Sequence, residues 1–335
     1  ATAEAVKTTV EAETEQTFFN DVLGLAYEQA SNGPDWEALR DRTENADENG
    51  DLKPLPPGVV PATGILLTAG VDCQDGWMAL QIVAHGRNRQ RWTVAYIVIP
   101  HHIGSEEGRL ALNAWLKKEF RTELGLPLTL DALAIDGGAW TDDVWSWAKT
   151  HPWSRVIIVK GGSNQNGPLM MPMKFERRND GKAKRRQKRA FILNVSMMKG
   201  NYYGWRAQDD PLERGYCYFA RGLGDQYYRE ITSEVRVLNR ARSGVVTAKW
   251  ELVEPTRRNE GLDTALYAEA AARRKGWASM TDDQWDALEA ERGKQAPDMQ
   301  PDLFDAELSV VPEVPEREEK PAAKRGLLDV LAGND

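Results

Sequence analysis

The chain has 335 residues, of which 41% are hydrophobic, and it carries 43 Lys and Arg residues against 51 Asp and Glu residues. This composition is sufficient for a folded core, and the length favours about two domains. The net charge of −8 excludes a molecule that is basic over its whole surface, so any nucleic-acid contact must be local.

The cysteine count and the apolar runs limit the cellular setting. Cys73 and Cys217 are the only cysteines, which is too few for a disulfide framework or a structural zinc site and fits a reducing compartment. No apolar run approaches the roughly 18–20 residues that span a membrane, and no signal peptide opens the chain. The sequence therefore predicts no membrane association and no secretion. Because it begins at Ala1 without Met, we also expect a fragment or a processed product.

Residues 1–62 predict a lead-in or linker. They include Asn32-Gly33-Pro34, a polar run at 42–51 and three nearby prolines, all of which are typical of irregular connections. Residues 17–27 have the pattern of a short helix.

The predicted core begins at Ile65. Three apolar runs, at residues 65–73, 77–85 and 92–99, are separated by turn residues and predict consecutive antiparallel strands. Residues 106–124 place leucines and aromatic residues at helical spacing, so we expect one long helix there.

The following segments alternate between strand and helix patterns. Residues 128–135 predict a strand that ends at Asp136, Thr141 is expected to cap the next helix, and residues 156–159 predict another buried strand. Three sequential strands followed by alternation predict an α/β fold with a mixed sheet flanked by helices.

The remaining predicted elements extend to residue 292. The expected strands are 190–195, 216–219, 234–238 and 245–252, and the expected helices are 197–207, 227–232, 260–275 and 281–292. Beyond Gly293 the chain is acidic and rich in proline, which predicts a disordered tail.

Three aspartates have notable positions in this pattern. Asp72 ends the first strand, Asp136 ends the strand after the first long helix, and Asp263 lies in the first turn of the last strong helix. Neighbouring parallel strands bring their ends together, and converging carboxylates favour a pair of Mg²⁺ or Mn²⁺ ions, about 3.5–4 Å apart, that assist phosphoryl displacement. The alternative is that these residues are turn formers, helix caps or partners of a helix dipole.

Three acidic motifs carry a family resemblance. They are LTAGVDCQ at 67–74, AIDGG at 134–138 and RNEGLD at 258–263, the last running into Tyr267 and Ala270-Ala271. Together with VKG at 159–161 and TFFNDVLG at 17–24, they resemble the nuclease half of large terminase subunits of lambda-like tailed phages. The resemblance covers roughly residues 17–275.

The resemblance implies a function and a site. It implies a ribonuclease H-like domain at residues 63–280 in which Asp72, Asp136 and Asp263 bind the catalytic ions, with Glu260 in a supporting, water-orienting part. The implied activity is a two-metal-ion endonuclease that cuts concatemeric double-stranded phage DNA during genome packaging. The implied partners are the small terminase subunit and the procapsid portal, in the host cytoplasm.

The chain lacks the motif of a packaging ATPase. The glycines of GSNQNG at 162–167 are followed by Pro168 and Leu169 rather than by Lys and Ser or Thr, so the phosphate and Mg²⁺ contacts of a P-loop are missing. We therefore expect no ATP site in this chain and an ATPase half outside it.

A dense basic segment lies at residues 174–189. It has nine basic residues against two acidic ones, a net charge of +7, and we interpret it as a DNA-contacting loop, the alternative being a solvated loop or a localisation-like patch. The basic residues are Lys174, Arg177, Arg178, Lys182, Lys184, Arg185, Arg186, Lys188 and Arg189.

Other residues favour structural interpretations. The four histidines have no metal-binding spacing, Cys73 is expected to be a small buried residue, and core packing is expected for the tryptophans near the second motif, with base stacking as the alternative. Residues 281–335 are expected to form a short helix and an acidic tail, whose apolar end at Leu327, Leu328 and Leu331 would dock the portal.

Two other functions compete with the terminase nuclease. A junction resolvase or transposase-like nuclease would keep the fold and change the substrate. A catalytically silent module that holds DNA or docks the portal would use the fold without chemistry.

Overall fold

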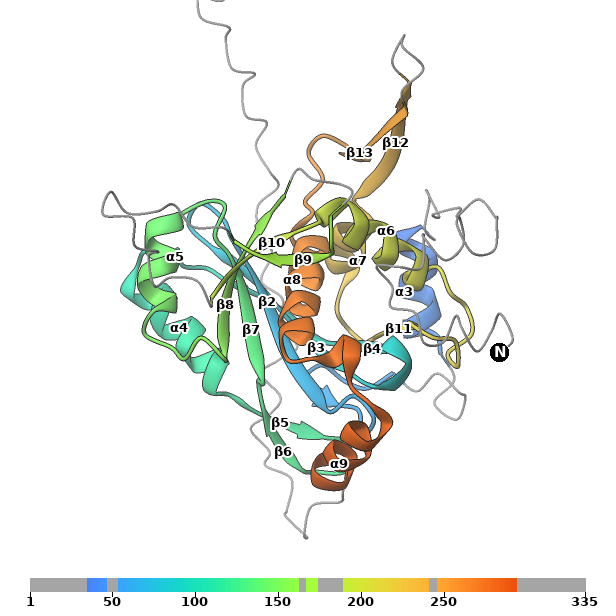
Figure 1. The fold of residues 1–335 in the computed structure, drawn as a ribbon. Coiled ribbons are helices and arrows are strands. Elements are labelled where there is room, and N and C mark those ends of the chain that lie inside the picture. The colour runs from blue at the N-terminus through green and yellow to red at the C-terminus, as the bar shows by residue number, and fades with distance from the viewer. Residues whose placement is uncertain (1–34, 47–53, 163–166, 174–188, 241–245, 294–335) are drawn as a thin grey trace, which may run out of the picture.

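A computed structural model describes residues 35–46, 54–162, 167–173, 189–240 and 246–293 (Figure 1). The helix predicted at residues 17–27, the basic residues 174–188 and the predicted tail from residue 294 lie outside the described residues.

A mixed sheet of eight strands forms the centre of the molecule. Strand β2 pairs antiparallel with β3 and parallel with β7, and the parallel pairing continues from β7 to β8 and β10. In spatial order the strands are β11 (Cys217–Phe219), β4 (Arg91–Ile99), β3 (Met78–His85), β2 (Leu66–Cys73), β7 (Ala132–Asp136), β8 (Val156–Gly161), β10 (Ala190–Leu193) and β9 (Met170–Pro172). The predicted mixed sheet flanked by helices is confirmed.

Helices cover both faces of this sheet (Figure 1). Helices α4 (Glu106–Lys117) and α5 (Thr141–Ala148) bury one face. Helices α6 (Val195–Arg206), α7 (Asp225–Ile231) and α8 (Glu260–Arg274) bury the other. Because successive strand residues alternate between faces, Leu133 and Ile135 join the first core, and Ala132 and Ala134 join the second.

Smaller elements complete the described fold. They are α3 (Trp36–Glu44), β1 (Val59–Val60), η2 (Arg87–Arg89), β5 (Glu119–Thr122), β6 (Pro127–Thr129), η3 (Trp277–Ser279), α9 (Asp282–Arg292) and a hairpin of β12 (Glu234–Arg240) and β13 (Val246–Leu252). The hairpin projects away from the central sheet (Figure 1).

Three local predictions around the first helices are wrong. The helix predicted at 106–124 ends at Lys117, because Lys118 is extended and the next residues form β5, where Phe120 is buried. The strand predicted at 128–135 is divided into β6 and β7. Thr141 is not the cap of α5: Trp140 occupies that position, in a left-handed conformation with φ of 49°, and its side chain makes no capping hydrogen bond.

Two segments outside the predicted core pack onto it. Helix α3, within the predicted lead-in, buries Leu39 in the core beside α7. Helix α9 buries Trp285, and its Arg292 bonds the carbonyl of Ile65 at 3.1 Å and the carboxylate of Asp131 at 2.8 Å. The ordered body of the described chain therefore extends beyond residues 63–280, although the division into domains stays a prediction.

Helix α8 lies directly against the backbone of β2. Alternate residues of β2 belong to the core that α4 and α5 cover. The residues between them, Thr68, Gly70 and Asp72, therefore lie on the face of the sheet that α8 covers. Thr68 donates a hydrogen bond to the carbonyl of Ala268 at 2.8 Å. A Cβ atom on Gly70 would lie 1.9 Å from the carbonyl oxygen of Thr264. Glycine is thus required at position 70 for this close approach.

A buried ion-pair cluster holds the second half of α8. Glu269 bonds Arg91 of β4 at 2.7 Å and Arg273 at 2.9 Å. Burial raises the pKa of Glu269, but the two guanidinium groups outweigh it and lower the pKa to about 2. The carboxylate therefore stabilises the fold at neutral pH, when it is charged.

We expect Gly70→Ala to destabilise the protein by roughly 1–3 kcal/mol or more, because the added methyl group meets the backbone of α8. The measurement is the free energy of unfolding from chemical denaturation. Gly204→Ala in α6 is the control, since a Cβ atom there meets nothing within 4 Å and alanine favours a helix. Equal destabilisation by the two variants would contradict the packing described for Gly70.

We expect Glu269→Gln to cost about 3 kcal/mol or more above pH 5, because two buried guanidinium groups lose their counter-charge. A carboxylate whose pKa is lowered in the folded state adds to the free energy of unfolding at pH values above its unfolded pKa of about 4.3. This stabilisation is lost as the pH falls towards 2. The difference from the parent protein should therefore shrink in acid. Glu213→Gln at an exposed position is the control, and a pH-independent difference would refute the ion-pair explanation.

Candidate active site at the ends of two parallel strands

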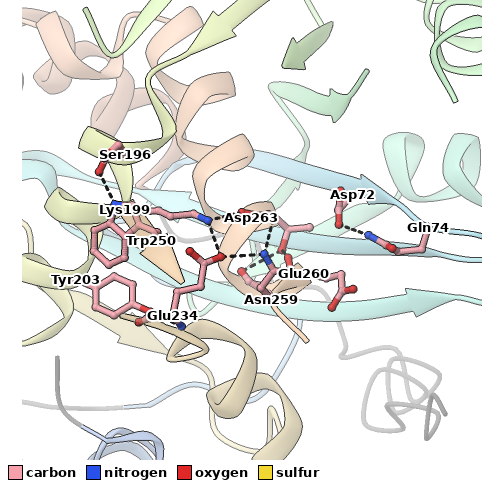
Figure 2. A network of polar contacts seen from close by, with 12 residues as sticks. Asp72, Gln74, Ser196, Lys199, Tyr203, Glu234, Trp250, Asn259, Glu260 and Asp263 are labelled. Atoms are coloured by element: carbon pink, nitrogen blue, oxygen red, sulfur yellow. Dashed lines mark hydrogen bonds and ion pairs between the residues drawn. The ribbon is translucent and has the colours of Figure 1, made fainter. Parts of the chain in front are cut away.

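The three predicted aspartates lie at one end of the β2–β7 pair. Val71 pairs with Ile135 in the parallel register, so the next residues, Asp72 and Asp136, are neighbours across the two strands. Asp263 lies in the first turn of α8, which reaches this end because α8 runs along β2 past Gly70. Figure 2 shows Asp72 and Asp263 within the same polar region.

Asp72 is buried and lies close to other carboxylates. It is only 7% exposed. Burial raises its pKa well above the ordinary value, and the negative charges of Asp263, Asp136 and Glu260 raise it further. The side-chain amide of Gln74 donates to its Oδ2 at 2.6 Å and partly opposes these effects.

Asp136 is held by the loop that follows it. Its carboxylate accepts hydrogen bonds from the backbone amides of Gly138 at 3.0 Å and Ala139 at 3.4 Å. A Cβ atom on Gly137 would lie 2.4 Å from the side chain of Ile158, so this glycine lets the chain turn tightly over β8. Burial raises the pKa of Asp136, whereas the loop amides and Lys160 lower it.

Asp263 contacts two side chains that the sequence did not indicate. The ammonium group of Lys199 lies 3.4 Å from its Oδ1, and the amide of Asn259 donates to its Oδ2 at 3.0 Å (Figure 2). Burial raises the pKa of Asp263 to about 6; Lys199 lowers it and the charge of Glu234 raises it.

Glu260 is buried at the start of α8 and pairs with a nearby cation. Arg258 lies 3.2 Å from Glu260 and 3.1 Å from the buried carboxylate of Glu230, and its guanidinium group lies over the ring of Trp77. The charge of Glu260 also contributes to the raised pKa of Asp72. A supporting role for Glu260 stays a prediction.

The sequence prediction missed Lys199, Glu234 and Asn259. Asn259 lies within the third acidic motif and could have been recognised there. Lys199 is a single lysine among the aromatic residues of α6, and Glu234 opens a strand. Neither has a local pattern that indicates proximity to Asp263, because only the tertiary fold brings α6, β12 and α8 together.

The chemistry of these carboxylates fits a hard divalent cation, which prefers oxygen ligands. Burial and the neighbouring carboxylates disfavour the ionised form of Asp72, and a cation relieves such repulsion. The described residues nevertheless include no group of three or more His, Cys, Asp or Glu side chains arranged to hold a metal ion. Instead, each aspartate contacts a different partner. Gln74 bonds Asp72, the loop amide of Gly138 bonds Asp136, and Lys199 pairs with Asp263.

Of the nine basic residues predicted to bind DNA, Arg189 lies in the described part of the chain. Its guanidinium group donates to the backbone carbonyls of Ala148, of Val156 at 3.2 Å and of His151 at 2.6 Å. These hydrogen bonds connect the end of α5 to β8, so Arg189 has a structural role. Its contact with DNA stays a prediction, as does that of residues 174–188.

The structural interpretations of Cys73, His85 and Trp147 fit their positions, whereas the core packing expected for Trp153 is wrong. Cys73 is a buried free cysteine. His85 is buried against Trp277 and bonds Thr68, and burial lowers its pKa to about 3. Trp147 packs in the core, whereas Trp153 is 42% exposed and lies under the guanidinium group of Arg274.

The mixed sheet flanked by helices, with aspartates at the ends of neighbouring strands, is compatible with the ribonuclease H-like nuclease fold. The family model "Terminase large subunit gpA, endonuclease domain" matches residues 1–285, and the chain belongs to this family. Membership implies a hydrolase of the endonuclease type, and it confirms the resemblance described above.

A relative among curated proteins agrees with this assignment. The chain is 26% identical over 270 residues to the "Terminase, large subunit" of Enterobacteria phage P21. The alignment covers 77% of this chain but only 38% of that protein, so the chain spans well under half of the relative's length. No solved structure matches the chain. Among the described residues, no helix is long and apolar enough to cross a membrane.

We expect Asp72→Asn to be at least as stable as the parent protein at pH 7 in EDTA. A carboxyl group with a raised pKa costs stability as the pH rises from its unfolded value of about 3.9, because ionisation is less favourable in the folded state. The melting temperature of the parent should therefore fall, relative to the variant, between pH 4 and 7. Asp75→Asn, at an exposed position, should follow the parent. A variant that loses stability throughout this range would indicate a purely structural role.

Proposed function

We propose that this chain is a metal-dependent endonuclease that cuts concatemeric double-stranded phage DNA during genome packaging. The observation that carries the proposal is the convergence of Asp72, Asp136 and Asp263 at the ends of β2, β7 and α8. Family membership supports the nuclease chemistry, and the electrostatics of Asp72 support the need for a cation.

The proposed metal ligands are these three aspartates. When bound, a pair of Mg²⁺ or Mn²⁺ ions would supply an activated water and stabilise the leaving 3′-oxygen of an in-line displacement. The chain's own groups orient the ligands: Gln74 bonds Asp72, the Gly138 and Ala139 amides bond Asp136, and Asn259 bonds Asp263. Such outer contacts fix the direction in which each ligand presents its oxygens.

The proposed DNA contacts come from Lys160 and from the basic segment at 174–189. Lys160, at the end of β8, affects the pKa of Asp136 and lies 3.4 Å from the hydroxyl of Thr141, so its charge is available at the rim of the site. The basic segment at 174–189 adjoins β10, the neighbour of β8 in the sheet. Phosphate contacts of this kind bind duplex DNA without reading its sequence.

The proposed setting follows from the terminase family. ATP hydrolysis would occur in a part of the enzyme outside this chain, the small terminase subunit would be a partner, and residues 294–335 would dock the procapsid portal. These events would take place in the host cytoplasm.

We expect the protein to nick supercoiled plasmid with Mn²⁺ or Mg²⁺ and to be inactive in EDTA. Asp72→Asn and Asp136→Asn should lower cleavage by orders of magnitude, because the ions that these carboxylates would bind provide both the nucleophile and the stabilisation of the leaving group. Binding to duplex DNA should persist in both variants, since it depends on basic groups elsewhere. Asp75→Asn is the matched control and should cleave like the parent.

The outcomes separate the competing functions. Full activity of Asp72→Asn, or activity that persists in EDTA, would overturn the proposed chemistry. DNA binding without cleavage at any metal concentration would favour a silent DNA-holding or portal-docking module. Strong preference for branched DNA over linear duplex would favour a resolvase-like nuclease.

A further inference from the structure

A buried lysine lies between two carboxylates beside the proposed metal ligands. The ammonium group of Lys199, on α6, is 2.6 Å from Glu234 and 3.4 Å from Asp263. The side chains of Lys199 and Glu234 are only 8% and 6% exposed. The amide nitrogen of Asn259 lies 3.0 Å from both Glu234 and Asp263 (Figure 2). These contacts form one network.

Glu234 is fixed in this network through its backbone as well as its side chain. The hydroxyl of Tyr203 accepts a hydrogen bond from the Glu234 amide at 3.0 Å and donates one to the Glu234 carbonyl at 2.5 Å. Trp250, on the paired strand β13, bonds the carbonyl of Ser196 at 3.2 Å. Both anchoring residues belong to α6, so the base of the hairpin and the position of the Glu234 carboxylate are set by one helix.

The charges in this region explain why a buried lysine is tolerated. Its ammonium group lies within ion-pair distance of two carboxylates, Glu234 at 2.6 Å and Asp263 at 3.4 Å, which compensate its charge. If the charged residue of a buried ion pair is removed, the remaining charges have no counter-charge and the folded state is strongly destabilised. Lys199 thus supplies, without any bound ion, positive charge that Asp263 and Glu234 both require.

We propose that Lys199 is a positioning residue that takes the place of a cation beside Asp263 and keeps the carboxylate of Glu234 beside the proposed metal ligands. This inference rests on the proposed function, in which Asp263 binds a divalent ion. The ion and the ammonium group then compete for Asp263, and Lys199 retains its shorter contact with Glu234 when the ion binds. The lysine therefore orders the site before the ion binds and weakens the affinity for the ion.

A purely structural ion pair makes a different prediction. It would stabilise the fold, and its loss would lower the melting temperature without a specific change in metal affinity. The measurement that separates the two roles is the concentration of Mn²⁺ at half-saturation, recorded without DNA by calorimetry and by the metal-induced shift in melting temperature.

We expect Lys199→Met to melt lower than the parent in EDTA and to bind Mn²⁺ roughly tenfold or more tightly, because a competing positive charge within a few ångströms is gone. Lys199→Arg keeps the charge and should keep an affinity near that of the parent. Lys149→Met, at an exposed position, is the control for a lost charge and should change neither quantity. Equal or weaker Mn²⁺ binding by folded Lys199→Met would overturn the inference.

A second variant tests the same inference if Lys199→Met does not fold. Glu234→Gln leaves Lys199 paired with Asp263 and removes one carboxylate, so Mn²⁺ binding should weaken several-fold. Unchanged Mn²⁺ binding by folded Glu234→Gln would count against the proposed competition.

Asp72→Asn separates this inference from the proposed function. A parent protein without a saturable Mn²⁺ response, or one matched by Asp72→Asn, would overturn both. A response that is lost in Asp72→Asn but identical in Lys199→Met and the parent would overturn only the role of Lys199.

Discussion

The close approach of α8 to β2 is the contact on which the site depends. Two strand residues advance by about 6.6 Å and four helical residues by roughly 6 Å. Thr68 therefore meets Ala268, and Gly70 meets Thr264, at matching intervals. The same alignment brings the first turn of α8, with Asp263, to the end of β2, where Asp72 lies. The absence of a side chain at position 70 therefore sets where the third carboxylate lies.

The strands, and the positions of the aspartates at the ends of these strands, could be predicted because their signals are local. Residues 65–73 form an apolar run with an aspartate near its end, and the small residues Ala132 and Ala134 alternate ahead of Asp136. The break at Lys118 could not be predicted, since Phe120 continues the helical spacing while its burial arises from strand pairing with β6. Lys199 and Glu234 escaped recognition because their partners come from elements distant in sequence.

The site combines opposite electrostatic demands. Near one half of α8, Glu269 has two guanidinium partners and its pKa is lowered to about 2. Near the other half, Asp72 faces other carboxylates and its pKa is raised. Helix α8 thus carries a compensated anion that fixes its second half to the sheet, and its first turn lies beside Asp72 of β2, a poorly compensated group that favours an added cation. Stability and reactivity are separated along its length.

The docking of α9 has a consequence for assembly. Arg87 pairs with Asp282, Asp286 and Glu289, and Arg292 reaches Ile65 and Asp131, so residue 293 lies near the beginning of β2. Asp72 lies at the other end of this strand, roughly 20–25 Å away at the usual rise per residue. Residue 293, the last described residue, therefore lies at the end of β2 that is opposite Asp72. A partner that bound the residues after 293 would therefore attach at the end of β2 opposite Asp72 and would not need to contact the three aspartates.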